Sequence, residues 1–240
     1  MKISKLSKAI RKILPLQYCG AVIVAAGNAS RMGGIDKVMA ELCGEPMIVR
    51  TVRAFQNCDA IKEIVIVTRK DLKKEISRLC GEFNKVTRIV TGGEDRQGSV
   101  EAGLNALSKK VKLAAIQDGA RPLITQAVID RTVRAAHTYG AAAPAIPVKD
   151  TIKIVQGGIV KNTPDRSTLW AVQTPQVFDY DLLQGALQKA RADKAAITDD
   201  CSAVERIGFG VKIVEGDEHN IKITTPMDLR VAEFLLEDKK

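Results

Sequence analysis

Short apolar runs alternate with amphipathic stretches along most of this chain. The stretches between the runs carry apolar residues at helical spacing, and the apolar or β-branched runs lie at 20–26, 64–67, 86–90, 113–116 and 141–147. A continuous run of this kind predicts a strand that is buried on both faces of a parallel sheet. Strands that alternate with helices predict an α/β fold, here a Rossmann-like, mostly parallel twisted sheet with helices on both faces.

The pattern changes at 151–163, which reads TIKIVQGGIVKNT. Two β-rich runs flank Gly157-Gly158, a pair typical of a two-residue hairpin turn. We therefore expect a β-hairpin arm that protrudes from the α/β domain. Its apolar residues Ile152, Ile154 and Ile159 need a surface to pack on, either a second subunit or the surface of the domain itself.

The last part of the chain returns to an α/β texture. It holds helical patterns at 180–191 and 199–207, β-branched runs at 211–214 and 221–223, and a final helix from Pro226. We see no linker or internal repeat after the N-terminal segment. We therefore expect a basic extension at 1–18 and a single domain at 19–240 whose arm spans about 148–168.

Charge and cysteine content narrow the classes of function. The net charge of +9 invites a nucleic-acid partner, but five of the cations lie in 1–18, without any acid. The rest is mildly basic, as a site for anionic substrates would be, so we expect no nucleic-acid partner. The extension resembles a membrane-surface or partner-binding helix, or else an extra helix packed on the domain.

No apolar run approaches the roughly 18–20 residues of a membrane span. Five cysteines stand scattered along the chain without metal-binding spacing. Reduced thiols in a cytoplasmic protein are the expectation.

The run that ends at Ala25 continues into the loop AAGNASRMGGIDK. Its spacing fits neither a P-loop nor a dinucleotide-binding fingerprint. Ligands of open α/β sheets bind beyond the carboxyl ends of such strands. We therefore expect a phosphate loop made by the backbone at Ala25, Ala26 and Gly27, with Arg31 and Lys37 as cations. An ordinary loop with two solvated cations is the alternative.

Two further clusters follow predicted strands. Gly93, Glu94 and Ser99 lie in GGEDRQGS, whose glycines permit close approach of a ligand or form a tight turn before a helix. Asp118 and Arg121 lie in QDGARP. A carboxylate at the end of a strand suits Mg²⁺ held together with substrate phosphates, and an Asp–Arg pair that organises the loop is the alternative.

Two more clusters lie later in the chain. On the arm, a stretch from Thr151 to Arg166 ends in a guanidinium that suits phosphate, unless it merely pairs with Asp165. Lys222 lies within an apolar run, so its charge needs a purpose or a partner. Thr198 and Thr224 can bind hydroxyls or phosphate oxygens, and Thr198 can instead cap the helix that begins near 199.

The chain has two histidines and no nucleophile elbow. A reaction without a side-chain general base therefore fits best. Transfer onto a phosphate acceptor is such a reaction, because a phosphomonoester with a second pKa near roughly 6 is mostly dianionic at neutral pH. Positioning and charge stabilisation are then the protein's task.

Seven segments, in this order, resemble one family. They are AAGNASRMGGIDK, GGEDRQGS, QDGARP, PVKDTIK, DRSTLWAVQTPQVF, ITDDCSAVE and EGDEHNIKITTPMDL, and together they are similar to the 2-C-methyl-D-erythritol 4-phosphate cytidylyltransferases of the non-mevalonate isoprenoid pathway. The resemblance covers about 19–238. It implies transfer of CMP from CTP to 2-C-methyl-D-erythritol 4-phosphate, release of pyrophosphate, and a requirement for Mg²⁺.

The resemblance also implies roles for particular residues. Arg31 and Lys37 match positions that stabilise the transition state, and Arg166 and Lys222 match those that hold the attacking phosphate. The CTP-binding segments match Ala25, Ala26, Gly27, Gly93, Glu94 and Ser99. Positions near the metal and the acceptor match Asp118, Arg121, Thr151, Thr198 and Thr224. The family exchanges its arm across a homodimer, so Arg166 is expected to act in the neighbouring subunit.

The chain departs from the family's usual pattern in its loops. Ala29 stands where a glycine is usual, Asp36 where a proline often precedes the lysine, and Gln117 where a histidine is usual. Ribitol 5-phosphate cytidylyltransferase shares most of the motifs and is the alternative. A non-catalytic relative that binds nucleotides or an anionic surface is a second alternative.

Overall fold

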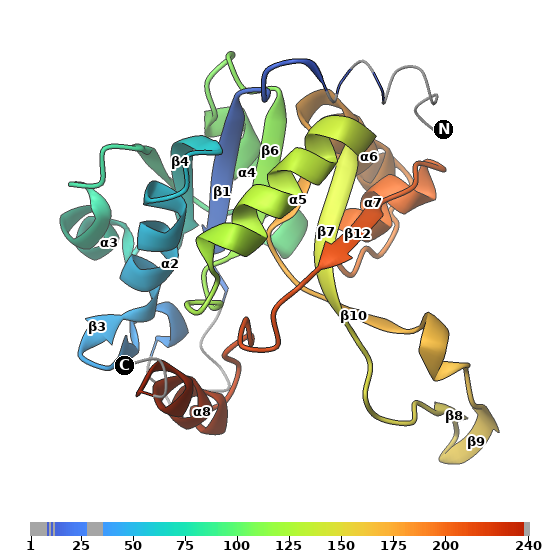
Figure 1. Cartoon of the computed structure of the whole chain (residues 1–240). Coiled ribbons are helices and arrows are strands. Elements are labelled where there is room, and N and C mark those ends of the chain that lie inside the picture. Colours follow the sequence, from blue (N-terminus) through green and yellow to red (C-terminus); the bar gives the residue numbers. More distant parts are fainter. Residues whose placement is uncertain (1–8, 10, 12, 28–35, 238–240) are drawn as a thin grey trace.

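Eight strands form one mixed sheet in the computed structural model, which describes residues 9, 11, 13–27 and 36–237 (Figure 1). Their order is β10-β7-β11-β6-β1-β4-β5, and β12 pairs with β7. Strands β5, β4, β1 and β6 run parallel, as do β7 and β12, whereas β11 and β10 are antiparallel to their neighbours. The bounds are β1 Cys19–Ala25, β4 Ile61–Thr68, β5 Val86–Thr91, β6 Leu113–Asp118, β7 Ala141–Pro147, β10 Trp170–Val172, β11 Gln176–Asp179 and β12 Lys212–Glu215.

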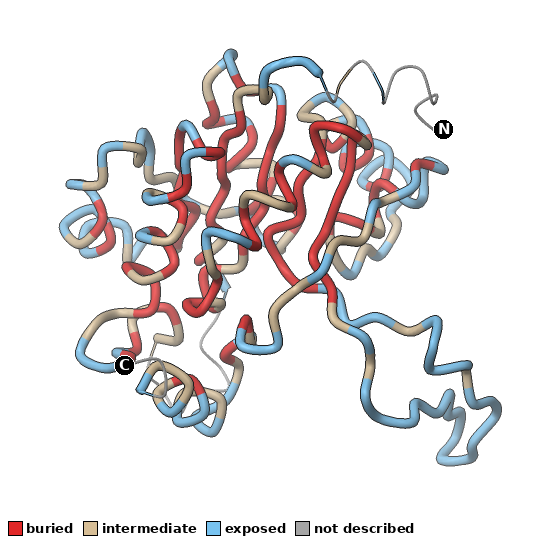
Figure 2. The backbone as a smooth tube through the Cα atoms, in the orientation of Figure 1, coloured by how far each residue is buried: buried red, intermediate tan, exposed pale blue. Residues whose placement is uncertain are grey.

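Helices cover both faces of this sheet, which confirms the predicted fold class (Figure 1). One face carries α2 (Met47–Gln56), α3 (Lys73–Cys80) and α5 (Gln126–Tyr139). The other carries α4 (Arg96–Ala106), α6 (Tyr180–Ala192) and α7 (Asp200–Arg206). Successive side chains of a strand point to opposite faces. Both faces of the central strands are covered, so these strands have few polar residues, and Figure 2 shows the buried backbone concentrated in them.

Helix α4 lies unusually close to the sheet at Gly103. A methyl group at that position would come 2.2 Å from Cγ1 of Val22 and 2.8 Å from Cγ2 of Val67. A side chain has no room there, so the helix packs through its backbone against β1 and β4.

The order of the strands creates a crevice between β1 and β6. The chain runs from β1 to β4 and β5 on one side, then crosses to β6 on the other side of β1. Adjacent loops therefore diverge at the carboxyl ends of β1 and β6, where open α/β sheets bind their ligands.

The expected arm is present and projects from the end of β7 (Figure 1). It holds β8 (Ile154–Gln156) and β9 (Ile159–Asn162), joined by Gly157 and Gly158, whose φ angles are +59° and +78°. A two-residue turn with two positive φ angles matches the twist of a hairpin and favours glycine. Every residue of both strands is exposed (Figure 2).

The C-terminal part differs from the prediction at one run. The run at 211–214 forms β12, but the run at 221–223 forms no strand. Ile223 donates one backbone bond to the carbonyl of Ala120 and buries its side chain among residues of β2 (Glu41–Leu42), α2 and α8 (Pro226–Glu237). The β-branched residues at 221–223 therefore reflect burial in a small core away from the sheet and not pairing with a strand. Near Ala40 and Glu41, the chain also forms the short strand β3 (Glu45–Pro46) and the 3₁₀ turn η1 (Lys37–Met39).

Most of the predicted basic helix lies outside the described residues. Arg11 is described, and its guanidinium donates to the carboxylate of Asp179 at 3.1 Å and to the carbonyl of His137 at 3.3 Å. This part of the extension therefore packs on the domain. It lies at the amino end of β6, where Asp179 pairs with Leu113, and so at the opposite end of the strand from the crevice. The prediction that 1–18 and 19–240 are separate units stays a prediction.

All five cysteines are free thiols, as expected. No helix within 13–27 and 36–237 is long and apolar enough to cross a membrane.

Candidate active site

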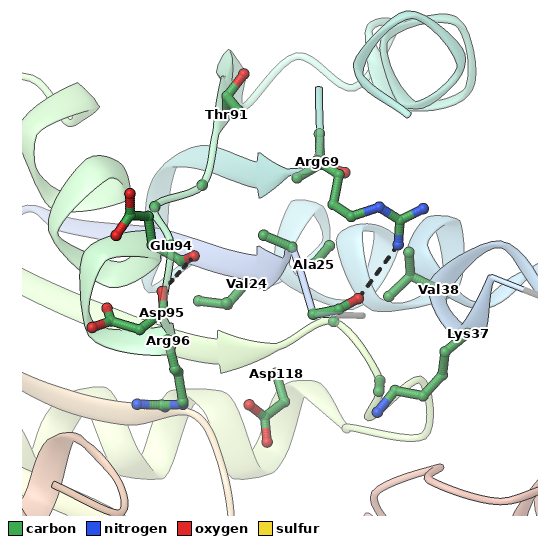
Figure 3. A pocket seen from close by; sticks show the side chains of 18 of the residues that line it. Val24, Ala25, Lys37, Val38, Arg69, Thr91, Glu94, Asp95, Arg96 and Asp118 are labelled. Atoms are coloured by element: carbon green, nitrogen blue, oxygen red, sulfur yellow. Dashed lines mark hydrogen bonds between the residues drawn. The ribbon is translucent and has the colours of Figure 1, made fainter. Parts of the chain in front are cut away.

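A cavity of about 480 Å³ opens at the carboxyl ends of β1, β4, β5 and β6 (Figure 3). Four of the segments in its wall lie at the ends of these strands, and Lys37, Val38 and Lys222 join them from η1 and from the loop after β12. Its lining residues are Val24, Ala25, Ala26, Gly27, Lys37, Val38, Thr68, Arg69, Lys70, Thr91, Gly92, Gly93, Glu94, Asp95, Arg96, Ser99, Asp118, Gly119, Ala120 and Lys222. The five cations outnumber the three carboxylates among them, so the cavity suits an anionic ligand.

The first loop supplies the strand end and one cation. Ala25, Ala26 and Gly27 line the cavity, and nothing lies within 4 Å of where a Cβ on Gly27 would stand. Lys37 enters from η1, and Figure 3 shows its side chain directed into the same space as Asp118. Ala29 and Arg31 lie outside the described residues. The predicted phosphate loop is thus described at both of its ends.

The loop between β5 and α4 is tightly packed as well as exposed to the cavity. A Cβ on Gly92 would stand 2.6 Å from Cβ of Ala26, and one on Gly93 would stand 2.7 Å from the backbone of Gly98. Ser99 is buried and its hydroxyl donates to the carbonyl of Asp95 at 3.0 Å. The glycines therefore serve the turn before α4, and they also let the backbone face the cavity.

Asp118 is the carboxylate at the end of β6, and two cations hold it. Nζ of Lys222 lies 2.9 Å from Oδ2 of Asp118, and Nε of Arg121 lies 3.6 Å from the same oxygen. Burial alone would raise the pKa of Asp118, but the positive charges of Lys222, Arg121 and Arg96 outweigh burial and hold that pKa below its ordinary value. Asp118 therefore keeps a negative charge inside a cavity wall.

Asp118 is the partner of Lys222, a lysine whose place in an apolar run predicted a purpose or a partner. Arg121 braces the segment before it by donating from Nη1 to the carbonyl of Asn220 at 2.6 Å. The amide of Asn220 donates to the carbonyl of Thr174 at 3.0 Å and lies fully buried. The Asp–Arg pair considered from the sequence is thus present, and it positions the loop that carries Lys222.

Two arginines of the cavity were missed by the sequence analysis. Arg96 makes a bidentate ion pair with Asp200, at 3.0 and 2.6 Å, and Asp200 is fully buried. Arg69 contacts two carboxylates, those of Asp36 and Asp71. No sequence motif connects Arg69 with Asp36 and Asp71, so its two ion pairs could not be predicted. Asp200, the partner of Arg96, lies in the segment ITDD, in which the sequence analysis assigned a role only to Thr198.

Thr198 and Thr224 lie just before the first turns of α7 and α8, outside the set of lining residues. Thr198 is exposed, and the cap of α7 is Asp199, whose side chain accepts from the backbone of Ser202 at 2.9 Å. The idea that Thr198 itself caps this helix is therefore wrong. The hydroxyl of Thr224 donates to Asp228 at 2.8 Å and helps to cap α8.

Thr151 and Arg166 lie on the arm and do not line the cavity of their own chain. Nη1 of Arg166 donates to the carbonyl of Lys149 at 2.7 Å. Asp165 does not serve as the partner that the alternative required, because its carboxylate caps the 3₁₀ turn η2 (Arg166–Thr168) through the backbone of Ser167 at 2.9 Å. The guanidinium of Arg166 is therefore presented on an exposed surface.

The residues around Asp118 fit one kind of metal site. The described part of the chain has no group of three His, Cys, Asp or Glu that could enclose an ion. Mg²⁺ is commonly held by one or two carboxylates together with substrate phosphates. A single ionised carboxylate beside a cationic cavity fits that mode and does not fit an all-protein cage.

Comparison with known proteins gives one consistent family. A sequence model described as IspD, 2-C-methyl-D-erythritol 4-phosphate cytidylyltransferase, matches residues 19–238. The 2-C-methyl-D-erythritol 4-phosphate cytidylyltransferase of Caldanaerobacter subterraneus is 46% identical over 225 residues, which cover 90% of this chain and 97% of that protein. The one of Symbiobacterium thermophilum is 49% identical over 221 residues, which cover 91% and 92%.

Solved structures agree with the sequence matches. The 4-diphosphocytidyl-2C-methyl-D-erythritol synthase of Anaerococcus prevotii superposes with a TM-score of 0.85 at 31% identity, covering 93% of this chain and 100% of that one. The 2-C-methyl-D-erythritol 4-phosphate cytidylyltransferase of Thermus thermophilus gives 0.75 at 30% identity, with 90% and 98% covered.

Proposed function

The chain belongs to the 2-C-methyl-D-erythritol 4-phosphate cytidylyltransferase family, and from this premise we propose that it transfers CMP from CTP to 2-C-methyl-D-erythritol 4-phosphate. In the reaction, a phosphate oxygen of the acceptor forms a bond to the α-phosphorus of CTP. The bond from that phosphorus to the bridging oxygen of the β-phosphate breaks, and pyrophosphate leaves with the electron pair. Every bond that forms or breaks is a phosphorus–oxygen bond.

The site suits this step because the step needs positive charge at the phosphates and needs no general base. No histidine stands among the lining residues. A dianionic acceptor phosphate has no proton to give up, so the protein has to orient the two substrates and stabilise charge. The observation that carries the proposal is the Asp118–Lys222 pair, braced by Arg121, which faces Lys37 across a cavity at the crevice of the sheet.

We assign the two sides of the cavity to the two substrates. The backbone at Ala25–Gly27 and the β5–α4 loop with Gly93, Glu94 and Ser99 would hold CTP, with Lys37 and Arg31 near its phosphates. Lys222 would hold the acceptor phosphate, which its partial exposure permits. Bound Mg²⁺, held by Asp118 and phosphate oxygens, would supply further positive charge at the reacting phosphates.

We further propose that the enzyme is a homodimer and that the arm serves the partner's site. Ile154, Val155, Ile159 and Val160 are 50–65% exposed on the arm, although side chains of this kind are usually buried. Arg166 and Thr151 lie on the same arm, away from the cavity of their own chain. Docking of the arm on a second copy would cover the apolar residues and bring Arg166 to the partner's Lys222.

The test is an assay of pyrophosphate release with purified protein. We expect release only when CTP, a divalent cation and 2-C-methyl-D-erythritol 4-phosphate are all present, and we expect UTP, ATP and GTP to be poor substitutes for CTP. Ribitol 5-phosphate is the matched control acceptor. If the protein turns over ribitol 5-phosphate much faster, the sibling activity replaces this proposal, and CTP binding without turnover of either acceptor would indicate a non-catalytic relative.

A further inference from the structure

Arg69 joins the two ends of the first loop through a single side chain. It follows the last residue of β4, and its guanidinium is directed toward the carboxyl end of β1 and toward η1 (Figure 3). Nη1 lies 2.5 Å from Oδ2 of Asp36 and 3.5 Å from the carbonyl oxygen of Gly27. Gly27 and Asp36 are the described residues on either side of 28–35.

The pairing with Asp36 is the stronger of these contacts, because Asp36 is largely enclosed. The side chain of Asp36 is 14% exposed, and within the described residues its Oδ2 receives no directed hydrogen bond. The positive charge of Arg69 therefore compensates this oxygen. A long contact such as that to Gly27 is weak by itself and adds direction rather than strength.

Asp71 fixes the orientation of the guanidinium. Its carboxylate accepts from Nε of Arg69 at 3.1 Å and from Nη2 at 2.9 Å, so it occupies one edge of the guanidinium. Nη1 is then left to point at Asp36 and Gly27. With two carboxylates around it, Arg69 is poorly placed to serve as a phosphate ligand.

Asp36 in turn sets the backbone of Lys37. Its Oδ1 accepts from the backbone of Val38 at 3.1 Å, and its carbonyl accepts from Met39 and Ala40 at 3.0 Å. Val38 is buried in the main core. Lys37 therefore stands between a residue held by Arg69 and a residue held by the core.

The backbone conformation of Asp36 is one that a proline could also adopt. Its φ is −64°, a value that the ring of proline would impose. An ion pair with Arg69 can hold from outside what a proline ring holds covalently.

We propose that Arg69 is a positioning residue that acts through Asp36 to set the place of Lys37 at the reacting phosphates. The proposal rests on the proposed function for the role of Lys37, but the clamp itself is a property of the fold. Displacement of a charge-stabilising group by about 1 Å can cost on the order of a hundredfold in rate.

The experiment compares Arg69→Ala, Asp36→Asn, the double variant and Asp36→Pro with the wild type. We expect Arg69→Ala to lower kcat by about 10- to 100-fold while the KM for CTP changes less than about threefold. Asp36→Asn should give a similar loss, and the double variant should lose little more, because both changes break one interaction. Asp36→Pro should recover most of the kcat in the Arg69→Ala background. Arg78→Ala, which removes an exposed arginine of α3, is the matched control.

Amide hydrogen exchange gives a readout that needs no substrate. We expect Arg69→Ala to speed exchange of the Val38, Met39 and Ala40 amides by about tenfold and Asp36→Pro to slow the exchange of Met39 and Ala40 again. Unchanged exchange at these amides would overturn the proposal even if the enzyme is active as proposed. A raised KM for CTP that Asp36→Pro does not rescue would assign Arg69 to phosphate binding instead. Failure of the wild type to use CTP would sink the proposed function, and the exchange data would still decide the clamp.

Discussion

The cavity and the arm carry candidate site residues that are held in opposite ways. At the cavity, Lys222 and Arg121 both pair with Asp118, and Asp200 holds Arg96 from a fully buried position. On the arm, Arg166 is exposed and its strands bury nothing within their own chain. The cavity is preorganised by its own fold, whereas nothing in the described part of the chain covers the strands of the arm.

Lys222→Ala tests the role of the cavity and has the largest expected effect. The change removes the closest cation from Asp118 and from the proposed place of the acceptor phosphate. We expect kcat/KM for the acceptor to fall by about 100- to 1,000-fold, with a smaller change in the affinity for CTP measured by calorimetry. Lys212→Ala on β12 is the control, because it removes a lysine outside the cavity. Equal losses for acceptor and CTP would contradict the assignment of Lys222 to the acceptor.

A second test compares one carboxylate of each region. Asp200→Asn breaks a buried ion pair, so we expect a loss of about 3–5 kcal/mol in the free energy of unfolding. Asp165→Asn on the arm keeps a good capping residue at an exposed site, so we expect a loss of less than about 0.5 kcal/mol. Urea unfolding followed by circular dichroism measures both. Similar losses would mean that the arm is as tightly integrated as the cavity.

A third test asks whether the arm acts in the partner's site. We expect Arg166→Ala to lower kcat/KM for the acceptor by about 10- to 100-fold without changing the melting temperature, because an exposed contact is lost. Lys161→Ala, also exposed on the arm, is its control.

Mixing of the two impaired variants then shows which subunit Arg166 serves. When Arg166→Ala and Lys222→Ala subunits are mixed and exchanged, half of the dimers are mixed, and each has one site with both defects and one site with neither. Recovery of about a quarter of the wild-type activity is expected if Arg166 serves the other subunit. Arg166 acting within its own subunit predicts no recovery.

The sequence predicted six of the eight strands of the sheet and the position of the cavity, but it did not predict β10 or β11. Strands β1 and β6 are buried on both faces, so the nearly unbroken apolar runs at 20–26 and 113–116 mark them. The β-branched run at 221–223 predicted a strand that does not form, because Ile223 is buried against helices in a small separate core. Local hydropathy reports burial but does not report which element provides it.

The partners of charged residues were largely beyond the sequence. Lys222 in an apolar run predicted a partner, yet Asp118 as that partner depends on where two distant loops meet. Arg69 and Arg96 carry no local signal, since ordinary solvated arginines look the same. The capping residue of α7 was closer to reach, because Ser202 stands three residues after Asp199, the spacing of a capping box.

Gly103 has a consequence for any attempt to alter the specificity of this enzyme. It lies outside the cavity, yet its contact with Val22 fixes how deeply α4 settles, and the N-terminal turn of α4 carries Arg96 and Ser99. A larger residue at Gly103 would lift that turn and reshape the chamber while its chemical lining stays the same. A variant library restricted to the lining residues would leave the position of α4 unchanged, and with it the shape that this helix gives the cavity.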